Sequence, residues 1–318
     1  MKKLAKTMLV AVMALSVTGC KKTDETGTTG SGGNKKEETI ELTATVESLF
    51  ENLKKKTEGV NDQTYRLYMD MNTSLSDGTT TKSSTFGETT TDGHNTYATS
   101  ETTSASSGET SQENAEMYFV DDSGTYTMYE NTDGGWVKYF QNTPTDFSID
   151  FQKLMNIDME NSTLEAEDGL YVIKATIEFA DAAEALPDGV EETVMDMVSS
   201  EYLTYAGRIP AVFQFDTASE ELVSVRFDFA TGINNALAHM ASDRGVESAP
   251  ITVDTMRVTL ADFNFSTVSI VLPEDVKNAT ETSAPSPLQK ESDPVPVETT
   301  DENTEQPEEA PQESPQPN

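Results

Sequence analysis

The sequence predicts an α+β fold, built on a curved antiparallel β-sheet whose concave side is covered by helices. Two patterns indicate this fold. Stretches with strand periodicity follow one another as a long meander and are joined by short turn signals. Helical periodicity is confined to one stretch at the start and to short stretches between hairpins. We expect one domain over residues 40–275, which is long enough for a single α+β unit.

The domain is expected to open with a helix over residues 41–60, ELTATVESLFENLKKKTEGV. Its apolar residues form one stripe at helical spacing: Leu42, Val46, Leu49, Phe50 and Leu53. Three lysines follow near its end, where the helix dipole favours cations, and Gly59 is expected to end the helix.

The period then changes to two. TYRLYMDMNTSL alternates apolar residues such as Leu67 with polar ones such as Asp70, as in a half-buried strand. Two Thr- and Ser-rich segments follow, separated by a turn signal at Asp92-Gly93. AEMYFVDDSGTYTMYENTDGGWVKYF then predicts two aromatic strands joined at Asp122-Ser123-Gly124, and a third short strand. Threonine supplies β-branching without hydrophobicity, so these strands suit a sheet with one face in water.

The second half interposes helices between hairpins. PTDFSIDFQKLMN predicts a short helix that begins at Pro144-Thr145-Asp146, and LPDGVEETVMDMVSSEYL predicts another. One hairpin turns at Asp168-Gly169, and RIPAVFQFDTASEELVSVRFDFATG forms a second. NNALAHMASDRG is either a short helix or an ordered loop. A long strand that begins at ITVDTMRVTL closes the domain.

The N-terminus has the pattern of an export signal over residues 1–19. Three lysines precede a short apolar run, which is too short to span a bilayer with ~20 residues. Val17-Thr18-Gly19-Cys20 then resembles the bacterial lipobox. This resemblance implies cleavage after Gly19, acylation of the Cys20 thiol with diacylglycerol, and anchoring to the outer face of the cell membrane. The alternative is an ordinary secretory signal with a chance cysteine.

Two segments flank the domain. Residues 20–39 contain the lipidated cysteine and a Gly-, Thr- and charge-rich tether with a span of about 25 Å. Residues 276–318 are expected to form a disordered, Pro- and Glu-rich acidic tail. The tail is either a spacer or interaction arm, or a solvating segment without a specific partner.

Charge and motifs exclude several functions. The formal net charge is −35, which argues against nucleic acid as a partner, since phosphate binding needs clustered basic residues. His94 and His239 lack metal-ligand spacing, and Cys20 is the only cysteine. GxSxG, P-loop and post-strand GxGxxG motifs are absent from the sequence. We therefore expect no metal, no cofactor and no enzymatic activity.

The layout resembles the LolA/LppX-like bacterial lipoproteins, especially a Gram-positive branch. The resemblance is carried by the lipobox, the tether, the leading helix, strands built like YRLYMDMN, the pattern YFVDDSGTYTMYENTDGGWVKY and the ending VSIVLPEDV. It implies a half-barrel that cradles acyl chains of lipids or lipoproteins. The Thr- and Ser-rich strands depart from the apolar lining of such a cradle.

Six residues are candidates for the lining of an apolar ligand cavity: Met69, Met71, Tyr118, Met128, Trp136 and Met195. Ordinary core packing is the alternative for each of them. Two functions follow. The first is a membrane-anchored extracytoplasmic lipoprotein that binds a lipid, an acyl chain or an apolar peptide in its half-barrel. The second is a structural or sensory envelope protein with a filled core, which acts through contacts with another envelope protein.

Overall fold

A computed structural model describes residues 43–132, 135–246 and 248–283. The expected signal peptide, Cys20, the tether and the tail beyond residue 283 lie outside these residues.

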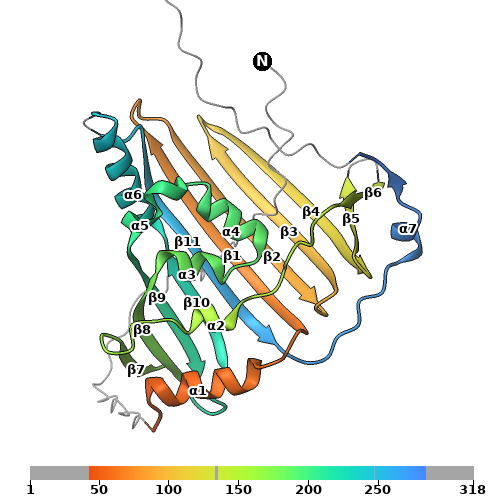
Figure 1. Ribbon diagram of the computed structural model, residues 1–318, viewed down its shortest axis with the longest axis horizontal. Helices are drawn as coiled ribbons and strands as arrows, with labels where there is room; N and C mark the ends of the chain where they lie inside the picture. Colours follow the sequence, from red (N-terminus) through yellow and green to blue (C-terminus); the bar gives the residue numbers. More distant parts are fainter. Residues whose placement is uncertain (1–42, 133–134, 247, 284–318) are drawn as a thin grey trace, which may run out of the picture. The chain divides into compact units, whose positions relative to one another are not determined.

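One large sheet organises the described residues (Figure 1), in the order β12-β6-β5-β4-β3-β2-β1-β11-β10-β9-β8-β7. Its strands are β1 (Gln63–Leu75), β2 (Thr80–Thr91), β3 (Asn95–Ser106), β4 (Glu109–Asp122), β5 (Thr125–Thr132), β6 (Gly135–Gln141), β7 (Thr163–Glu167), β8 (Leu170–Glu178), β9 (Arg208–Asp216), β10 (Leu222–Asp228), β11 (Ile251–Asn264) and β12 (Thr280–Glu281). Neighbouring strands are antiparallel, except that β12 pairs with β6 in parallel. The predicted curved antiparallel sheet is confirmed.

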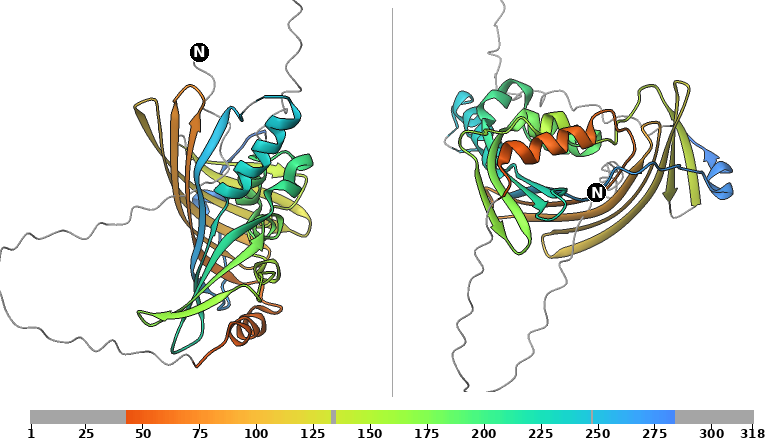
Figure 2. Two further views of the ribbon diagram at one scale, coloured as in Figure 1. Left: turned by 90° about the vertical axis from the view of Figure 1, so that its left-hand side faces the viewer. Right: turned by 90° about the horizontal axis from the view of Figure 1, so that it is seen from below.

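The helical segments other than α7 lie on the concave side of this sheet (Figure 2, right), whereas α7 lies outside it beside β6 (Figure 1). The helical segments are α1 (Val46–Thr57), α2 (Phe151–Leu154), α3 (Phe179–Glu184), α4 (Asp188–Met195), the 3-10 turn η1 (Ser200–Tyr202), α5 (Leu203–Ala206), α6 (Ala230–Asp243) and α7 (Glu274–Lys277). In α1, Thr45 and Ser48 form a reciprocal capping box, which satisfies backbone N–H groups at the helix start. The apolar stripe of α1 buries Leu49, Phe50 and Leu53.

The predicted hairpins form at their turn signals. Ser123 and Gly124 have φ values of 56° and 92°, and Asp168 and Gly169 have values of 50° and 82°. Paired positive φ values are typical of tight hairpin turns whose twist matches that of the flanking strands. These turns set the register of β4 with β5 and of β7 with β8.

The register brings apolar side chains of five strands onto the concave face. Met69 of β1 lies opposite Val258 of β11, which lies opposite Phe227 of β10. Ala211 of β9 follows in the same row, and then Ala175 of β8. Together with α1–α6 these strands enclose one large apolar core.

Several elements differ from the sequence-based prediction. Asp150, not the segment at Pro144, caps α2 by accepting from the N–H groups of Gln152 and Lys153. The helix α3 was not predicted, because its Phe- and Ala-rich residues continue the apolar run of β8. The segment that was either helix or loop is the 14-residue helix α6.

Ordered elements also continue beyond the expected domain end at Asp275. After β11 the chain contains no strand until β12, whose residues pair with Val137 and Lys138 of β6. Val276 of α7 is only 1% exposed. The first residues of the expected acidic tail are therefore part of the folded unit, and β12 covers part of the β6 edge.

Candidate functional site

The six predicted cavity residues are divided between the two faces of the sheet. Register pairs Phe119, Met128 and Tyr139 on the helix-covered face. Tyr118 lies on the opposite, convex face and contacts Trp136, with 5.6 Å between their ring centroids. The six residues therefore do not line one cavity. Successive strand residues point to opposite faces, and both faces of β4–β6 carry aromatic side chains.

The methionines belong to packed cores. Met69 is 1% exposed and is a member of the large core, while Met71 and Met195 are partly buried against its margin. Met128 belongs to a smaller core with Ala98, Met117, Phe119 and Tyr139. These four methionines therefore contribute to core packing, which was the alternative to a role in lining a ligand cavity.

The segment between β6 and α2 covers the smaller core. Figure 1 shows it crossing in front of the sheet. Phe147 of this segment packs on Phe119, with 5.6 Å between ring centroids. The Tyr65 hydroxyl donates to the Phe147 carbonyl oxygen at 2.6 Å, and burial raises the Tyr65 pKa. The end of the concave face nearest this segment is therefore closed by protein.

The inner face of β2 and β3 is built from hydroxyl groups. Thr85, Thr89, Thr91 and Thr96 are all buried. Thr85 and Thr102 share a hydrogen bond at 3.3 Å between their hydroxyl oxygens. Buried hydroxyls must keep such partners, so this part of the sheet offers little apolar lining for an acyl chain.

The convex face of β3–β6 carries an aromatic row with a carboxylate. Tyr97 and Tyr118 have ring centroids 4.7 Å apart. The Tyr97 hydroxyl donates to Glu116 at 3.0 Å; burial and this carboxylate raise the pKa of Tyr97 to about 12. Asn131 donates to the other Glu116 oxygen. Tyr118 is buried, so the row is in part a packed surface.

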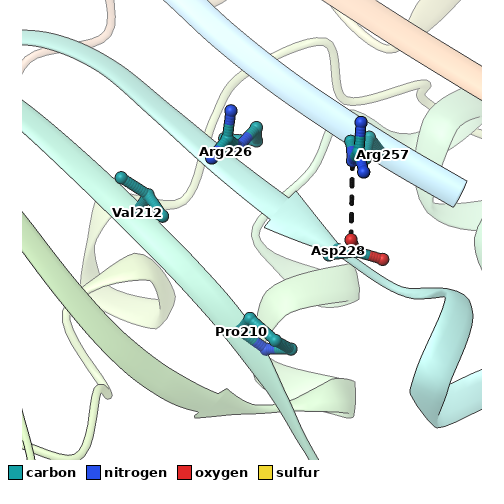
Figure 3. A pocket seen from close by; sticks show the side chains of 5 residues that line it. All are labelled: Pro210, Val212, Arg226, Asp228 and Arg257. Atoms are coloured by element: carbon teal, nitrogen blue, oxygen red, sulfur yellow. Dashed lines mark hydrogen bonds and ion pairs between the residues drawn. The ribbon is translucent and has the colours of Figure 1, made fainter.

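The surface of the described residues includes the following two hollows. The first has a volume of about 240 Å³ and lies on the convex face. Figure 3 shows its lining: Pro210, Val212, Arg226, Asp228 and Arg257. The second, of about 420 Å³, lies where α3 meets α5 and is lined by parts of residues 178–181 and 203–207. Neither contains any of the six predicted residues.

Arg226 and Arg257 were not singled out from the sequence. Each occupies a polar position in an alternating strand, in VSVRFDF and in DTMRVTL. Their scarcity could have marked them as candidates, because the chain has only 21 lysines and arginines against 56 acidic residues. Register then brings these two arginines together from β10 and β11, which no local pattern reveals.

Among residues 43–132, 135–246 and 248–283, no helix has both the length and the apolar character needed to cross a membrane. Within the same ranges, no three or more histidine, cysteine, aspartate or glutamate side chains are placed to hold a metal ion. His94 lies in the β2–β3 turn with a 74% exposed side chain, and His239 stacks on Tyr205.

Comparison with known proteins gives a remote structural likeness. No family model matches the chain, and no curated protein matches it. A solved structure, the beta-barrel-like protein of domain of unknown function DUF1849 from Brucella abortus, is similar over 65% of this chain and 99% of its own. The identity is 9% and the TM-score is 0.23, which is too low to carry an argument. The LolA/LppX resemblance stays a prediction.

Proposed function

We propose that this protein is an extracytoplasmic lipoprotein, anchored through diacylglycerol on Cys20, that binds its partner through the outer surface of a filled half-barrel. The observation that supports a filled half-barrel is the core itself. The concave face beneath the helices is occupied by side chains such as Phe213, Phe227 and Met69, each at most 1% exposed. A carrier of acyl chains needs an enclosed pocket of about 300 Å³ or more with an apolar lining. The hollow of about 420 Å³ at α3 and α5 is open to solvent and includes Glu178 and Asp181 in its lining.

Anchoring is part of the same proposal. The lipobox-like segment and the tether of about 20 residues would hold the folded unit within about 25 Å of the membrane. The partner is then another component of the cell envelope, and the protein acts by binding rather than by catalysis. The acidic tail adds negative charge but no basic surface for nucleic acid.

A second candidate function is the binding of a lipid, an acyl chain or an apolar peptide beneath a movable helical layer. One observation favours it. The helical segments over residues 179–206 are short, and α3, α4, η1 and α5 have no side-chain cap. Short uncapped helices contribute little stability of their own. Lifting them would expose methionines at the core margin, including Met195 and Met197.

Native mass spectrometry of the full chain, purified from its own membrane, distinguishes the two functions. The filled half-barrel predicts the mass of the lipidated chain alone, with unchanged mass after incubation with fatty acids and phospholipids. A stoichiometric non-covalent acyl ligand would overturn it in favour of the carrier. Peptide mass spectrometry tests the anchor, because it shows whether the N-terminal peptide of the mature protein has a diacylglycerol group on Cys20.

A further inference from the structure

We propose that the hollow between Arg226 and Arg257 on the convex face binds the phosphate group of a small hydroxylated phosphate ester. This inference rests on the proposed function, in which the protein binds through its outer surface, and it names a ligand for that surface. The geometry that carries it comes from β9, β10 and β11, and from the position at which the ladder between β9 and β10 ends.

The hollow forms where that ladder stops. The register of β9 with β10 runs from Phe215–Leu222 to Ala211–Phe227. The next residue of β9 is Pro210, which has no backbone N–H to continue the ladder. On the other strand, Asp228 ends β10, and its carboxylate accepts from the N–H of Ala230 at the start of α6. The strands therefore lose their pairing at this level of the sheet.

Two guanidinium groups face this hollow (Figure 3), but they differ in their partners. Arg257 contacts the Asp228 carboxylate at 3.5 Å, and Asp70 of β1 lies opposite Arg257 in register. Arg226 is exposed, and among the described residues its guanidinium group has no hydrogen-bond or ion-pair partner. The other strand arginines, Arg66 and Arg208, both have carboxylate partners.

Arg226 is thus the strand arginine whose side chain is not paired with a carboxylate among the described residues. Arg226 lies opposite Thr259, and Arg257 is its diagonal neighbour on β11. The Asp228 carboxylate pairs with Arg257, which leaves the guanidinium of Arg226 without a paired carboxylate. A guanidinium presents its N–H groups as a planar fork that matches the oxygens of phosphate. The unpaired guanidinium of Arg226 therefore has free donors to offer to an anionic ligand in the hollow.

The rest of the lining indicates what the phosphate carries. Pro210 and Val212 provide an apolar floor for a few carbon atoms, and the Asp228 carboxylate is an acceptor for a hydroxyl group. The volume of about 240 Å³ is below that of drug-sized pockets, so the site suits a small ester or the head of a larger molecule. A soluble phosphate ester and a phospholipid headgroup share this chemistry.

The test uses residues 20–318 with Cys20→Ser, and glycerol 3-phosphate as the probe in titration calorimetry at low salt. We expect saturable binding that weakens about tenfold or more in Arg226→Gln, the loss of a charge-assisted hydrogen bond. Arg226→Lys should fall between the two, because it keeps the charge but not the fork. Lys82→Gln is the matched control. It removes one exposed cation from β2, on the same convex face but away from the hollow, and its affinity for the probe should stay within twofold of the parent.

A second arm separates the two sources of phosphate. Cosedimentation with phosphatidylglycerol vesicles, compared with phosphatidylcholine vesicles, measures binding to a headgroup. Binding of either probe that is lost in Arg226→Gln supports the site, and the tighter probe identifies the source. Absence of saturable binding to both probes, or an equal loss in Lys82→Gln, overturns it. If the protein has no acyl ligand and does not bind phosphate, only the phosphate site is refuted. If it binds phosphate but also has an acyl ligand, only the filled half-barrel is refuted.

Discussion

The side-chain amide of Gln63 pairs with the backbone of Ile149 as a neighbouring strand would. Its Oε1 accepts the Ile149 N–H at 2.9 Å, and its Nε2 donates to the Ile149 carbonyl oxygen at 3.4 Å. Both residues are buried, so these backbone groups have little access to water and need the amide as their partner. The contact fastens the segment between β6 and α2 to the first residue of β1.

Replacing this amide should therefore be costly. Gln63→Leu keeps the approximate size of the side chain but leaves the N–H and C=O of Ile149 unpaired. Each unsatisfied buried group costs about 1–3 kcal/mol, so we expect the free energy of unfolding to fall by about 2–4 kcal/mol in urea titration. Gln152→Leu is the control at an exposed position of α2, with an expected change within about 0.5 kcal/mol. Equal effects of the two substitutions would contradict the role of the amide pair.

The sequence predicts the sheet better than the covering segments, for a physical reason. Strand alternation and turn signals such as Asp168-Gly169 are local, and they led to the correct hairpins. The contacts that hold the β6–α2 segment and α6 against the sheet are not local in the sequence. Gln63 pairs with a residue 86 positions away, and Asn234 of α6 makes the same kind of amide pair with the backbone of Val253. No periodicity marks either residue.

The sequence also does not determine which side chains of β4–β6 point toward the concave face. Both sets of alternate residues in these strands include aromatic or apolar side chains, so either set could do so. The register of β4 with β3 determines which set lies on the concave face. Phe119 lies opposite Thr96 on the buried face, whereas Tyr118 lies opposite Tyr97 on the convex face. Two of the six predicted cavity residues, Tyr118 and Trp136, were for this reason grouped with residues from which the sheet separates them.

A filled core makes a direct prediction about cavity formation. Phe213 is fully buried, and its ring lies 5.0 Å from that of Phe50 and 6.4 Å from that of Phe227. Phe213→Ala should lower the free energy of unfolding by about 3–5 kcal/mol, because it removes apolar contacts and leaves a cavity. The measurement is urea unfolding followed by circular dichroism.

Phe140→Ala is the matched control for this cavity. Phe140 lies on β6 and is 51% exposed, so its truncation removes much less buried area. We expect a change of about 0.5 kcal/mol or less. If Phe213→Ala were as mild as the control, the space around Phe213 would not be packed, and the proposed filled half-barrel would lose its support.

Gly232 allows α6 to approach its neighbours closely. A Cβ at this position would lie 2.7 Å from Cδ2 of Phe179 and 3.2 Å from the carbonyl oxygen of Ala206. Gly232→Ala gains up to about 1 kcal/mol of helix propensity but overpacks the contact at a cost of about 1–3 kcal/mol. We expect a net loss of about 1 kcal/mol in thermal or urea unfolding. Asn235→Ala, at an exposed position of the same helix, has the propensity gain without the clash and should stabilise by about 0.5 kcal/mol. A stabilising Gly232→Ala would show that α6 can move away from Phe179.

Glu130 should make stability depend on pH. Burial raises the pKa of its carboxyl above the ordinary value, and this effect outweighs the hydrogen bond from the Tyr139 hydroxyl, which acts in the opposite direction. That bond has an O–O distance of 2.6 Å. The folded chain therefore binds the proton more tightly than the unfolded chain does. The resulting stability is fully present below the ordinary glutamate pKa, and it is lost as the pH rises through the raised pKa of the folded state.

Glu130→Gln removes the charge while its amide oxygen still accepts from the Tyr139 hydroxyl. The variant should unfold at a higher temperature than the parent at pH 7, and the difference should shrink as the pH is lowered toward 4. Glu113→Gln removes one negative charge from an exposed position of β4 and thus measures the effect of net charge alone. If both variants gained the same stability at pH 7, the gain would come from reducing the chain's negative charge, and burial of Glu130 would not be its cause.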